Sequence, residues 1–244
     1  MIAEVKRQPR SNRRPRLSTK YKTNLPADLL SRLCALCYYG LYTTGIKACI
    51  KERMGKVRSL QITDWCHEIF EKFVPAGGGY IDATMGQGQD TLFLCRLAGE
   101  GGQVWAFDIQ EKALELTREL LEREGMDKRA RLILCGHEHM DRYLEPESVD
   151  GICFNFGYLP GRDHRIATRP GTSVAAVEQG LKLLKPGGMM SLCIYSGGDT
   201  GFEERDALLA FLRKLPSRQY TVIQTSYYNR SGHPPLPVFV FRQK

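Results

Sequence analysis

Residues 80–88 read Tyr-Ile-Asp-Ala-Thr-Met-Gly-Gln-Gly and join an apolar strand to an amphipathic segment. Gly86 and Gly88 let the backbone turn tightly at this point and approach a ligand without a Cβ clash. A glycine turn between a strand and a helix lies where a parallel sheet binds its ligands. Because many kinds of nucleotide-binding sheet share such a turn, it predicts by itself only that the domain binds a nucleotide-like ligand.

The chain on either side of this turn alternates between strand and helix patterns. The predicted strands are Tyr80–Thr84, Gln103–Asp108, Arg131–Leu134, Val149–Phe156, Met189–Tyr195, Tyr220–Ser226 and Val238–Arg242. The predicted helices are Asp90–Leu97, Glu111–Glu124, Val174–Leu184 and Glu203–Leu215, preceded by a helix from Ile62 to Phe73 with Thr63 or Asp64 available as its cap. This alternation predicts an α/β fold, with a parallel sheet covered by helices on both faces. No helix separates the last two strands, so the sheet contains an antiparallel strand.

Charge divides the chain near Gln61. Residues 1–60 hold 14 Lys and Arg against 3 Asp and Glu, a net charge of +11, whereas the whole chain carries +8 and residues 61–244 therefore −3. We expect a basic N-terminal extension over residues 1–60, partly disordered and partly helical, and one domain over residues 61–244. The extension fits three alternatives: an arm that binds a polyanion such as RNA, a solvated tail without a partner, or a misplaced start with translation beginning nearer Met54.

Hydropathy and cysteine usage give the expected compartment. No apolar stretch approaches the roughly 18 residues of a membrane span, and the basic N-terminus lacks the apolar core of a secretory signal. We therefore expect a cytoplasmic protein with no membrane partner; a homodimer is compatible with the sequence. The chain has eight cysteines. Cys34, Cys37, Cys49 and Cys66 fit no zinc spacing, so we expect packing roles and no metal.

Asp82 and Thr91 narrow the ligand of the glycine turn. Asp82 ends the first predicted strand. A carboxylate that faces the ligand would repel a pyrophosphate but tolerate the sulfonium and amino groups of S-adenosylmethionine (SAM). Thr91 stands where the dinucleotide fingerprint requires a third glycine, which disfavours NAD-dependent redox chemistry.

Polar residues also follow the next two strands. Asp108 ends the second strand, where a carboxylate can accept hydrogen bonds from both hydroxyls of a bound ribose, and Gln110 can contact the same ribose or the adenine. Gly136 and His137 follow the third strand, where an adenine edge would lie. For His137 the alternative is an ordinary surface-loop residue.

The segment after the fourth strand suggests the chemistry. Residues 155–161 read Asn-Phe-Gly-Tyr-Leu-Pro-Gly. Transfer of a methyl group to an amine requires a neutral nitrogen with an oriented lone pair. The side-chain carbonyl of Asn155 can accept an amine N–H without becoming charged, and the ring of Tyr158 can pack against the acceptor or a sulfonium. Gly157, Pro160 and Gly161 fit a simple tight turn equally well.

Three segments together resemble one family: 82–91, 107–110 (Phe-Asp-Ile-Gln) and 155–161. The family is that of bacterial methyltransferases once labelled putative rRNA methylases, now associated with N-methylation of 5-aminomethyl-2-thiouridine at the tRNA wobble position. The resemblance, from about Gln61 to Lys244, implies the Rossmann-like seven-stranded fold of SAM-dependent methyltransferases. It also implies SAM contacts from the loop that contains Gln87, Asp90 and Thr91, a ribose site at Asp108 and Gln110 beside His137, and an acceptor loop over 155–161.

This sequence departs from the family pattern at three places. Gln87 and Gln89 stand where Asn and His are common. Residues 196–201 replace a Gly-His-Pro-like turn, and residues 229–235 keep only part of an Asn-Gln-x-Asn-x-Pro-Pro loop. The last two segments are expected near the substrate.

The resemblance makes a tRNA wobble-uridine amine methyltransferase the leading hypothesis, with tRNA as the partner. Methylation of rRNA or of a small-molecule amine by the same cofactor core is the second hypothesis. An RNA-binding module that has a nucleotide site but no catalysis is the third.

Overall fold

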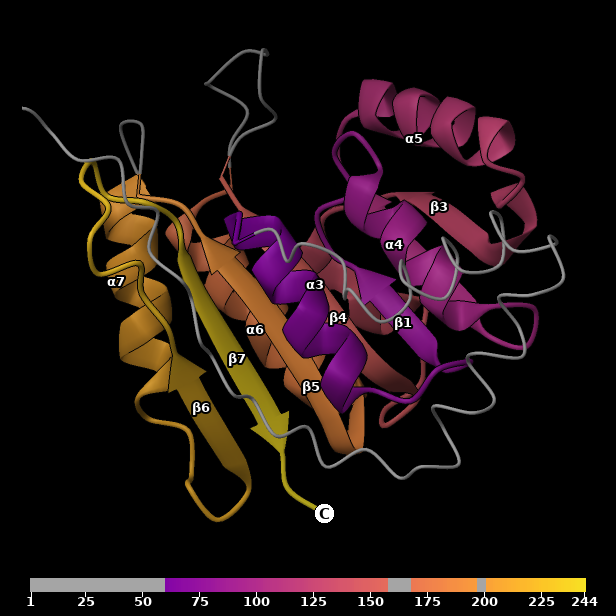
Figure 1. Cartoon of the computed structure of the whole chain (residues 1–244). Helices are drawn as coiled ribbons and strands as arrows, with labels where there is room; N and C mark the ends of the chain where they lie inside the picture. The colour runs from indigo at the N-terminus through magenta and orange to yellow at the C-terminus, as the bar shows by residue number, and fades with distance from the viewer. Residues whose placement is uncertain (1–59, 158–167, 197–200) are drawn as a thin grey trace, which may run out of the picture. The chain divides into compact units, whose positions relative to one another are not determined.

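The computed structural model describes residues 60–157, 168–196 and 201–244. They contain a seven-stranded sheet in the order β3-β2-β1-β4-β5-β7-β6, drawn in Figure 1. The strands are β1 (Gly79–Asp82), β2 (Gln103–Asp108), β3 (Ala130–Leu134), β4 (Val149–Phe156), β5 (Leu184–Ile194), β6 (Tyr220–Gln224) and β7 (Leu236–Arg242). The first five are parallel, and β7 pairs antiparallel with both β5 and β6. The predicted α/β class and its antiparallel strand are confirmed.

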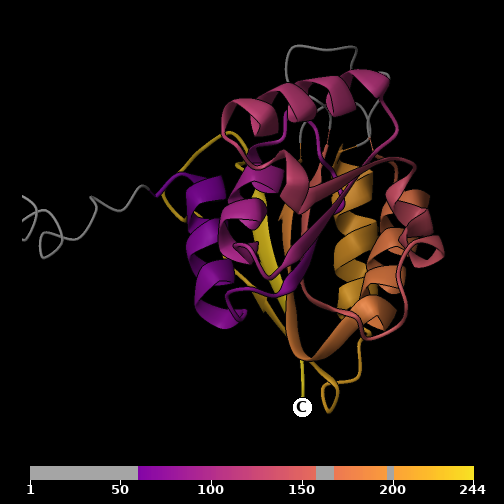
Figure 2. The ribbon, with the colours of Figure 1, turned by 90° about the vertical axis from the view of Figure 1, so that its right-hand side faces the viewer.

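Helices cover both faces of this sheet. They are α3 (Ile62–Phe73), α4 (Gln89–Ala98), α5 (Glu111–Arg123), α6 (Pro170–Leu183) and α7 (Gly201–Leu212), with short 3-10 helices η1 (Asp127–Arg129) and η2 (His137–Arg142). Figure 2 shows α3 and α4 on one side of the strands and α6 and α7 on the other. The buried apolar residues form two clusters accordingly, one under α3, α4 and α5 and one under α6, α7 and η2.

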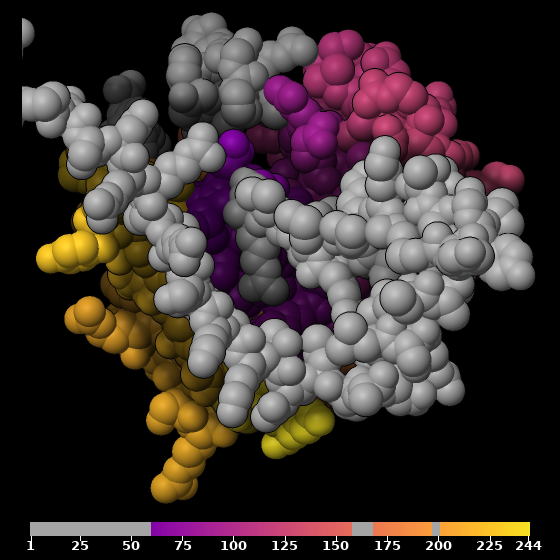
Figure 3. Space-filling view, viewed as in Figure 1, coloured from indigo at the N-terminus to yellow at the C-terminus, as the bar shows by residue number. Residues whose placement is uncertain are grey.

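Helix α3 packs across β5, and its last residue, Phe73, meets Phe241 of β7 edge to face at a centroid distance of 5.0 Å. In Figure 3 the indigo surface of the segment that begins with α3 lies beside the yellow and orange surface of the C-terminal part of the chain. The side chain of Cys66 from α3 is buried in the apolar cluster under α3, α4 and α5, which is the packing role expected for it.

Most predicted helices and strands are present at the expected place in the chain. Where the structure differs from the prediction, the first or last residue of the element differs. Strands β2 and β4 have the predicted bounds. Helix α6 begins at Pro170 instead of Val174, because a proline in the first turn costs no hydrogen bond and has a helical φ. The predicted cap of α3 is wrong: Gln61 occupies the N-cap position, and its side chain does not cap the helix. Thr63 and Asp64 lie inside the first turn, where a carboxylate favours the positive end of the helix dipole.

Several predictions fall on residues that the structure does not describe, namely 1–59, 158–167 and 197–200. They concern the N-terminal extension, Tyr158, and the cysteines Cys34, Cys37 and Cys49. Across the described residues, no helix is both long and apolar enough to cross a membrane. The same residues contain no group of three or more side chains that could hold a metal ion.

Candidate active site

The carboxyl ends of the parallel strands border a cavity of about 780 Å³, a size typical of small-ligand sites. It brings together eight of the predicted site residues from loops far apart in the sequence: Gly86, Gln87, Asp90, Asp108, Gln110, Gly136, His137 and Asn155. Three others, Asp82, Gly88 and Thr91, are not part of the wall. The wall also includes residues that the sequence did not predict for the site, among them Thr63, Thr84, Ile109, Arg169 and Tyr195.

Asp108 ties the glycine turn to the end of β2. One of its carboxylate oxygens accepts the backbone N–H of Gly86 at 3.0 Å, and the other accepts that of Gln110 at 2.9 Å. Each oxygen keeps a lone pair, so the carboxylate can still accept hydrogen bonds from a ligand in the cavity. The two backbone contacts fix the orientation that the predicted ribose-binding role requires.

Asp82 lies behind the wall and not on it. Its side chain is fully buried and accepts hydrogen bonds from the backbone N–H of Thr84 at 3.1 Å and the hydroxyl of Thr91 at 2.6 Å. The expectation that this carboxylate faces the ligand is therefore corrected: because β1 ends at Asp82, the following residues form the wall in front of it. Burial, and then the neighbouring carboxylate of Asp90, raise the pKa of Asp82 to about 7.

Gly88 has a packing role. Its backbone is left-handed, with φ +80°, and a Cβ there would lie 2.8 Å from the hydroxyl oxygen of Thr117 on α5. The turn thus needs glycine twice over, for its backbone conformation and for the close approach of the start of α4 to α5. This approach explains why Gly88 is next to the cavity without contributing to its wall.

Asn155 is oriented by a chain of side chains that starts on α3. The amide nitrogen of Asn155 donates to one oxygen of Asp90 at 2.5 Å, and the ring nitrogen Nε2 of His67 donates to the other at 2.8 Å. The amide must present its nitrogen to the carboxylate, because a carboxylate is only an acceptor. The carbonyl oxygen of Asn155 therefore remains available in the cavity. The backbone N–H of Asn155 donates to the hydroxyl of Thr84 at 2.7 Å, which fixes the main chain as well.

His67 is the residue that sequence patterns did not reveal. Its ring stacks on Phe93 of α4 at 3.9 Å with an interplanar angle of 6°, so its position is fixed from two sides. The available signal was a histidine at the edge of the apolar face of α3, beside Cys66 and Phe70. Its partner Asp90 is 23 residues away, and periodicity within α3 carries no information about that pairing.

Two titratable side chains of the wall, His137 and Tyr195, favour their uncharged forms. His137 is buried, which lowers its pKa, and it lies in η2 instead of the exposed loop that was the alternative for it. Burial, followed by the influence of Cys193, raises the pKa of Tyr195, so its hydroxyl stays protonated. The charged residues of the described wall are then Asp90, Asp108 and Glu138 against Arg169. Such a wall favours a ligand that carries positive charge.

The chain resembles known proteins over most of its length. Residues 104–241 match the family described as "Putative rRNA methylase". A chloroplastic tRNA (mnm(5)s(2)U34)-methyltransferase of Arabidopsis thaliana is 35% identical over 191 residues, which are 75% of this chain and 69% of the relative.

Solved structures agree with these sequence matches. A putative rRNA-methylase from Clostridium thermocellum superposes with a TM-score of 0.72 at 40% identity, over 74% of this chain and 96% of that one. A putative methyltransferase from Streptococcus mutans in complex with SAH superposes with a TM-score of 0.67 at 34% identity, over 75% and 99%. The relatives come from a plant chloroplast and from bacteria, so they establish a family and not a bacterial origin.

These matches confirm the predicted cofactor, S-adenosyl-L-methionine. The described residues fit it, because the cavity has the size for a nucleoside-containing ligand and its acidic wall suits a sulfonium cation. Asp108 and Gln110 would hold the ribose and adenine, and the loop from Thr84 to Gln87 would lie against the rest of the molecule. Each of these individual contacts remains a prediction.

Proposed function

Because this chain belongs to the "Putative rRNA methylase" family and is a SAM-dependent methyltransferase, we propose that it methylates the aminomethyl nitrogen of 5-aminomethyl-2-thiouridine at the tRNA wobble position. The product is 5-methylaminomethyl-2-thiouridine. The relative from Arabidopsis thaliana supports the RNA class and this nucleoside through its own name. The observation that carries the amine acceptor is the orientation of Asn155, whose carbonyl oxygen is left free by the bond from its amide nitrogen to Asp90.

The cofactor supplies a methyl group on a positively charged sulfur, open to in-line attack by a nucleophile. The protein's part is to hold a neutral amine with its lone pair directed at that carbon. The carbonyl of Asn155 accepts one amine N–H and so orients the lone pair. An amide suits this role better than a carboxylate, because it does not favour the protonated, unreactive ammonium form.

Asp90 and His67 keep the amide in this orientation. Asp90 accepts from both neighbours at once, and the stacked ring of His67 prevents the carboxylate from rotating away. Attack leaves a positive charge on the methylated nitrogen, and that nitrogen then passes one proton to water. The carboxylate of Asp90, which lines the cavity beside Asn155, stabilises that developing charge.

Methylation of rRNA is the second candidate, and the description of the matching family favours it. Methylation of a small-molecule amine needs only the same cofactor core. An RNA-binding module without catalysis is the candidate from another class, but the oriented amide of Asn155 in the cavity favours an enzyme over it.

The test is mass spectrometry of tRNA nucleosides from a strain that lacks the gene. Unmethylated 5-aminomethyl-2-thiouridine should accumulate, and the wild-type gene should restore the methylated nucleoside. The Asn155→Ala gene should not restore it, because loss of the positioning group reduces turnover by roughly 10²-fold. Binding of SAH to the purified variant should stay close to wild type.

An unchanged tRNA nucleoside profile in the deletion strain would sink the tRNA assignment. Loss of a methyl group from rRNA in that strain would establish the second candidate instead. Full restoration by Asn155→Ala would remove Asn155 from the mechanism.

A further inference from the structure

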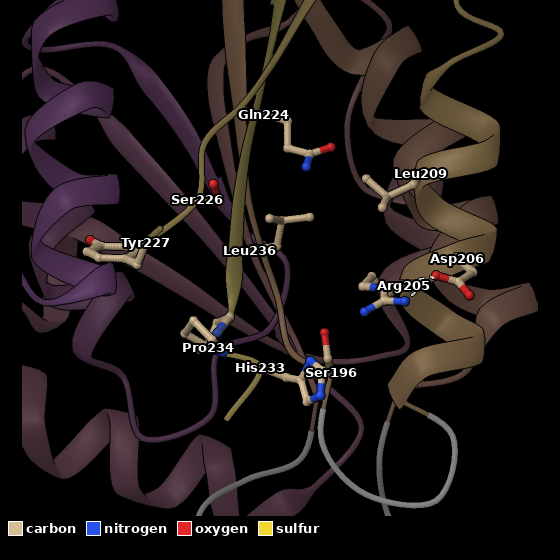
Figure 4. Close-up of a pocket in the computed structure, with 11 residues that line it drawn as sticks. Ser196, Arg205, Asp206, Leu209, Gln224, Ser226, Tyr227, His233, Pro234 and Leu236 are labelled. Atoms are coloured by element: carbon tan, nitrogen blue, oxygen red, sulfur yellow. Dashed lines mark hydrogen bonds and ion pairs between the residues drawn. The ribbon is translucent and has the colours of Figure 1, made fainter. Parts of the chain in front are cut away.

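A second hollow, of about 340 Å³, opens between α7 and the β6–β7 ribbon (Figure 4). The hollow and the cofactor cavity meet consecutive residues after β5: Tyr195 lines the cavity and Ser196 lines the hollow. The other lining residues are Arg205, Asp206, Leu209, Gln224, Ser226, Tyr227, His233, Pro234, Pro235 and Leu236. The hollow therefore lies on the same side of the sheet edge as the loop after β5 that borders the cofactor cavity.

The lining suits a flat ring with polar edges. Leu209 of α7 and Leu236 of β7 face the hollow from opposite sides in Figure 4, and the amide of Gln224 lies at one end, where it offers both a donor and an acceptor. Apolar side chains can cover the faces of a nucleobase, while amide and hydroxyl groups can pair with its edge.

A tight turn beside the hollow presents an exposed aromatic ring. The backbone N–H of Arg230 donates to the carbonyl of Tyr227 at 3.2 Å and closes the turn. The guanidinium of Arg230 lies 4.2 Å above the ring of Tyr227. Tyr228, at the corner, is 99% exposed. A ring exposed to this extent offers its face to a base that stacks on it.

A second pair of cation and ring lies at the start of α7. The guanidinium of Arg205 is 4.9 Å from the ring centroid of Phe202, and the ring of His233 meets the same Phe202 edge to face at 5.2 Å. Arginines interleaved with aromatic rings are the combination that proteins use to hold unpaired nucleotides, by stacking on the bases and neutralising the phosphates.

We propose that the hollow and the turn Tyr227–Arg230, together called the flanking-nucleotide surface, bind the unpaired nucleotides next to the one that is methylated. This inference rests on an RNA substrate, as in the proposed function, but not on the identity of the modified base. The hollow takes one base, the ring of Tyr228 stacks on a neighbouring base, and Arg230 pairs with a phosphate. RNA is thus selected by its unpaired loop.

The test is the binding of a fluorescent RNA hairpin to the full-length protein over a series of salt concentrations. Tyr228→Ala should weaken binding roughly 5- to 100-fold without changing the salt slope, because it removes a stacked ring and no charge. Tyr228→Phe should restore the binding. Arg230→Ala should weaken binding and reduce the slope of log affinity against log salt by about 0.7 to 1. The matched control is Arg218→Ala, which removes the same charge just before β6, at the opposite end of the strands, and should leave binding close to wild type.

Two parallel measurements separate this proposal from the proposed function. SAH binding by each variant reports whether the cofactor site is intact, and methylation of bulk tRNA by the wild type tests the activity on its own. If the wild type methylates tRNA while Tyr228→Ala and Arg230→Ala bind the hairpin unchanged, the flanking-nucleotide surface is wrong and the function stands. If the wild type does not bind the hairpin, the surface is not an RNA site. The same conclusion holds if Tyr228→Ala changes the oligomeric state of the protein, as measured by sedimentation, and leaves its RNA affinity unchanged.

Discussion

At the scale of single residues, the cavity is organised by hydrogen bonds that cross between elements. The carboxylate of Asp90 shows this best, because it joins His67 of α3 to Asn155 at the end of β4. Of these three residues, Asn155 is predicted from its motif and Asp90 from the family resemblance. His67 is found only from the structure, since its role follows from where α3 packs.

The role of His67 can be measured. His67→Ala removes both the hydrogen bond to Asp90 and the stack on Phe93, so Asp90 and then Asn155 lose their orientation. We expect kcat to fall about tenfold, the scale of one hydrogen bond to a charged group, while the KM for SAM changes little. His67→Gln should recover most of kcat, because its amide N–H can donate from nearly the same place as Nε2. Equal kcat for His67→Ala and wild type would contradict the positioning role. A loss of SAM affinity large enough to explain the entire loss of activity would contradict it as well.

Asp82 predicts how stability depends on pH. Its ordinary pKa is 3.8, and burial raises the pKa to about 7 in the folded protein. Between these values the folded state holds more protons than the unfolded state, so the contribution of Asp82 to stability falls as pH rises from about 4 to about 7. The slope is at most about 1.4 kcal/mol per pH unit. Asp82→Asn should flatten this part of the profile in urea unfolding. Parallel profiles for the wild type and Asp82→Asn would show that the carboxyl does not titrate in this range.

At the scale of elements, the turn from β1 into α4 depends on one close approach. Gly88→Ala must adopt a left-handed backbone, and its Cβ would meet Thr117 at under 3 Å. Gly125→Ala is the matched control, because Gly125 also has a positive φ, of +67°, but nothing lies within 4 Å of its Cβ position. We expect about 1 to 2 kcal/mol of destabilisation at Gly125 and more at Gly88.

A second substitution isolates the contact with α5. Thr117→Ala in the Gly88→Ala background should recover part of the difference, because it removes the two nearest atoms. Chemical denaturation measures the free energy of unfolding of the wild type, Gly88→Ala, Gly125→Ala and the double variant. Equal losses at Gly88 and Gly125 would mean that the helices simply move apart and that the approach is not needed.

The elements also show what the sequence can and cannot predict. Strand ends carry the polar residues of a parallel sheet, so the sequence pattern was enough to assign Asp108, Gly136 and Asn155 to one edge. The same rule misplaced Asp82, because it does not tell whether the last residue of a strand faces the cavity or the layer behind it. The start of β5 was also missed. Its register with β4 shifts between Val149 and Gly151, and the pattern of side chains across such an irregularity no longer alternates.

At the scale of the whole molecule, charge and chemistry are divided between two parts of the sequence. The domain from residue 61 is close to neutral, whereas residues 1–60 carry a net charge of +11. The flanking-nucleotide surface contributes the charges of Arg205 and Arg230, of which Arg205 is paired with Asp206. Affinity for an RNA of ordinary length would then come mainly from the extension, and recognition of the unpaired loop from the domain.

Deleting residues 1–58 tests this division. RNA affinity at low salt should fall, and the slope of log affinity against log salt should lose about 0.7 for each phosphate contact that the extension makes. SAH binding should not change. A full-length variant with the basic residues of 1–58 replaced by glutamine should behave like the deletion, since charge and not length is the cause. If the truncated protein keeps the wild-type slope, the extension does not bind RNA. The alternatives are then a solvated tail and a start site nearer Met54. The mass of the protein purified from its natural source distinguishes them, because a start near Met54 gives a lighter protein.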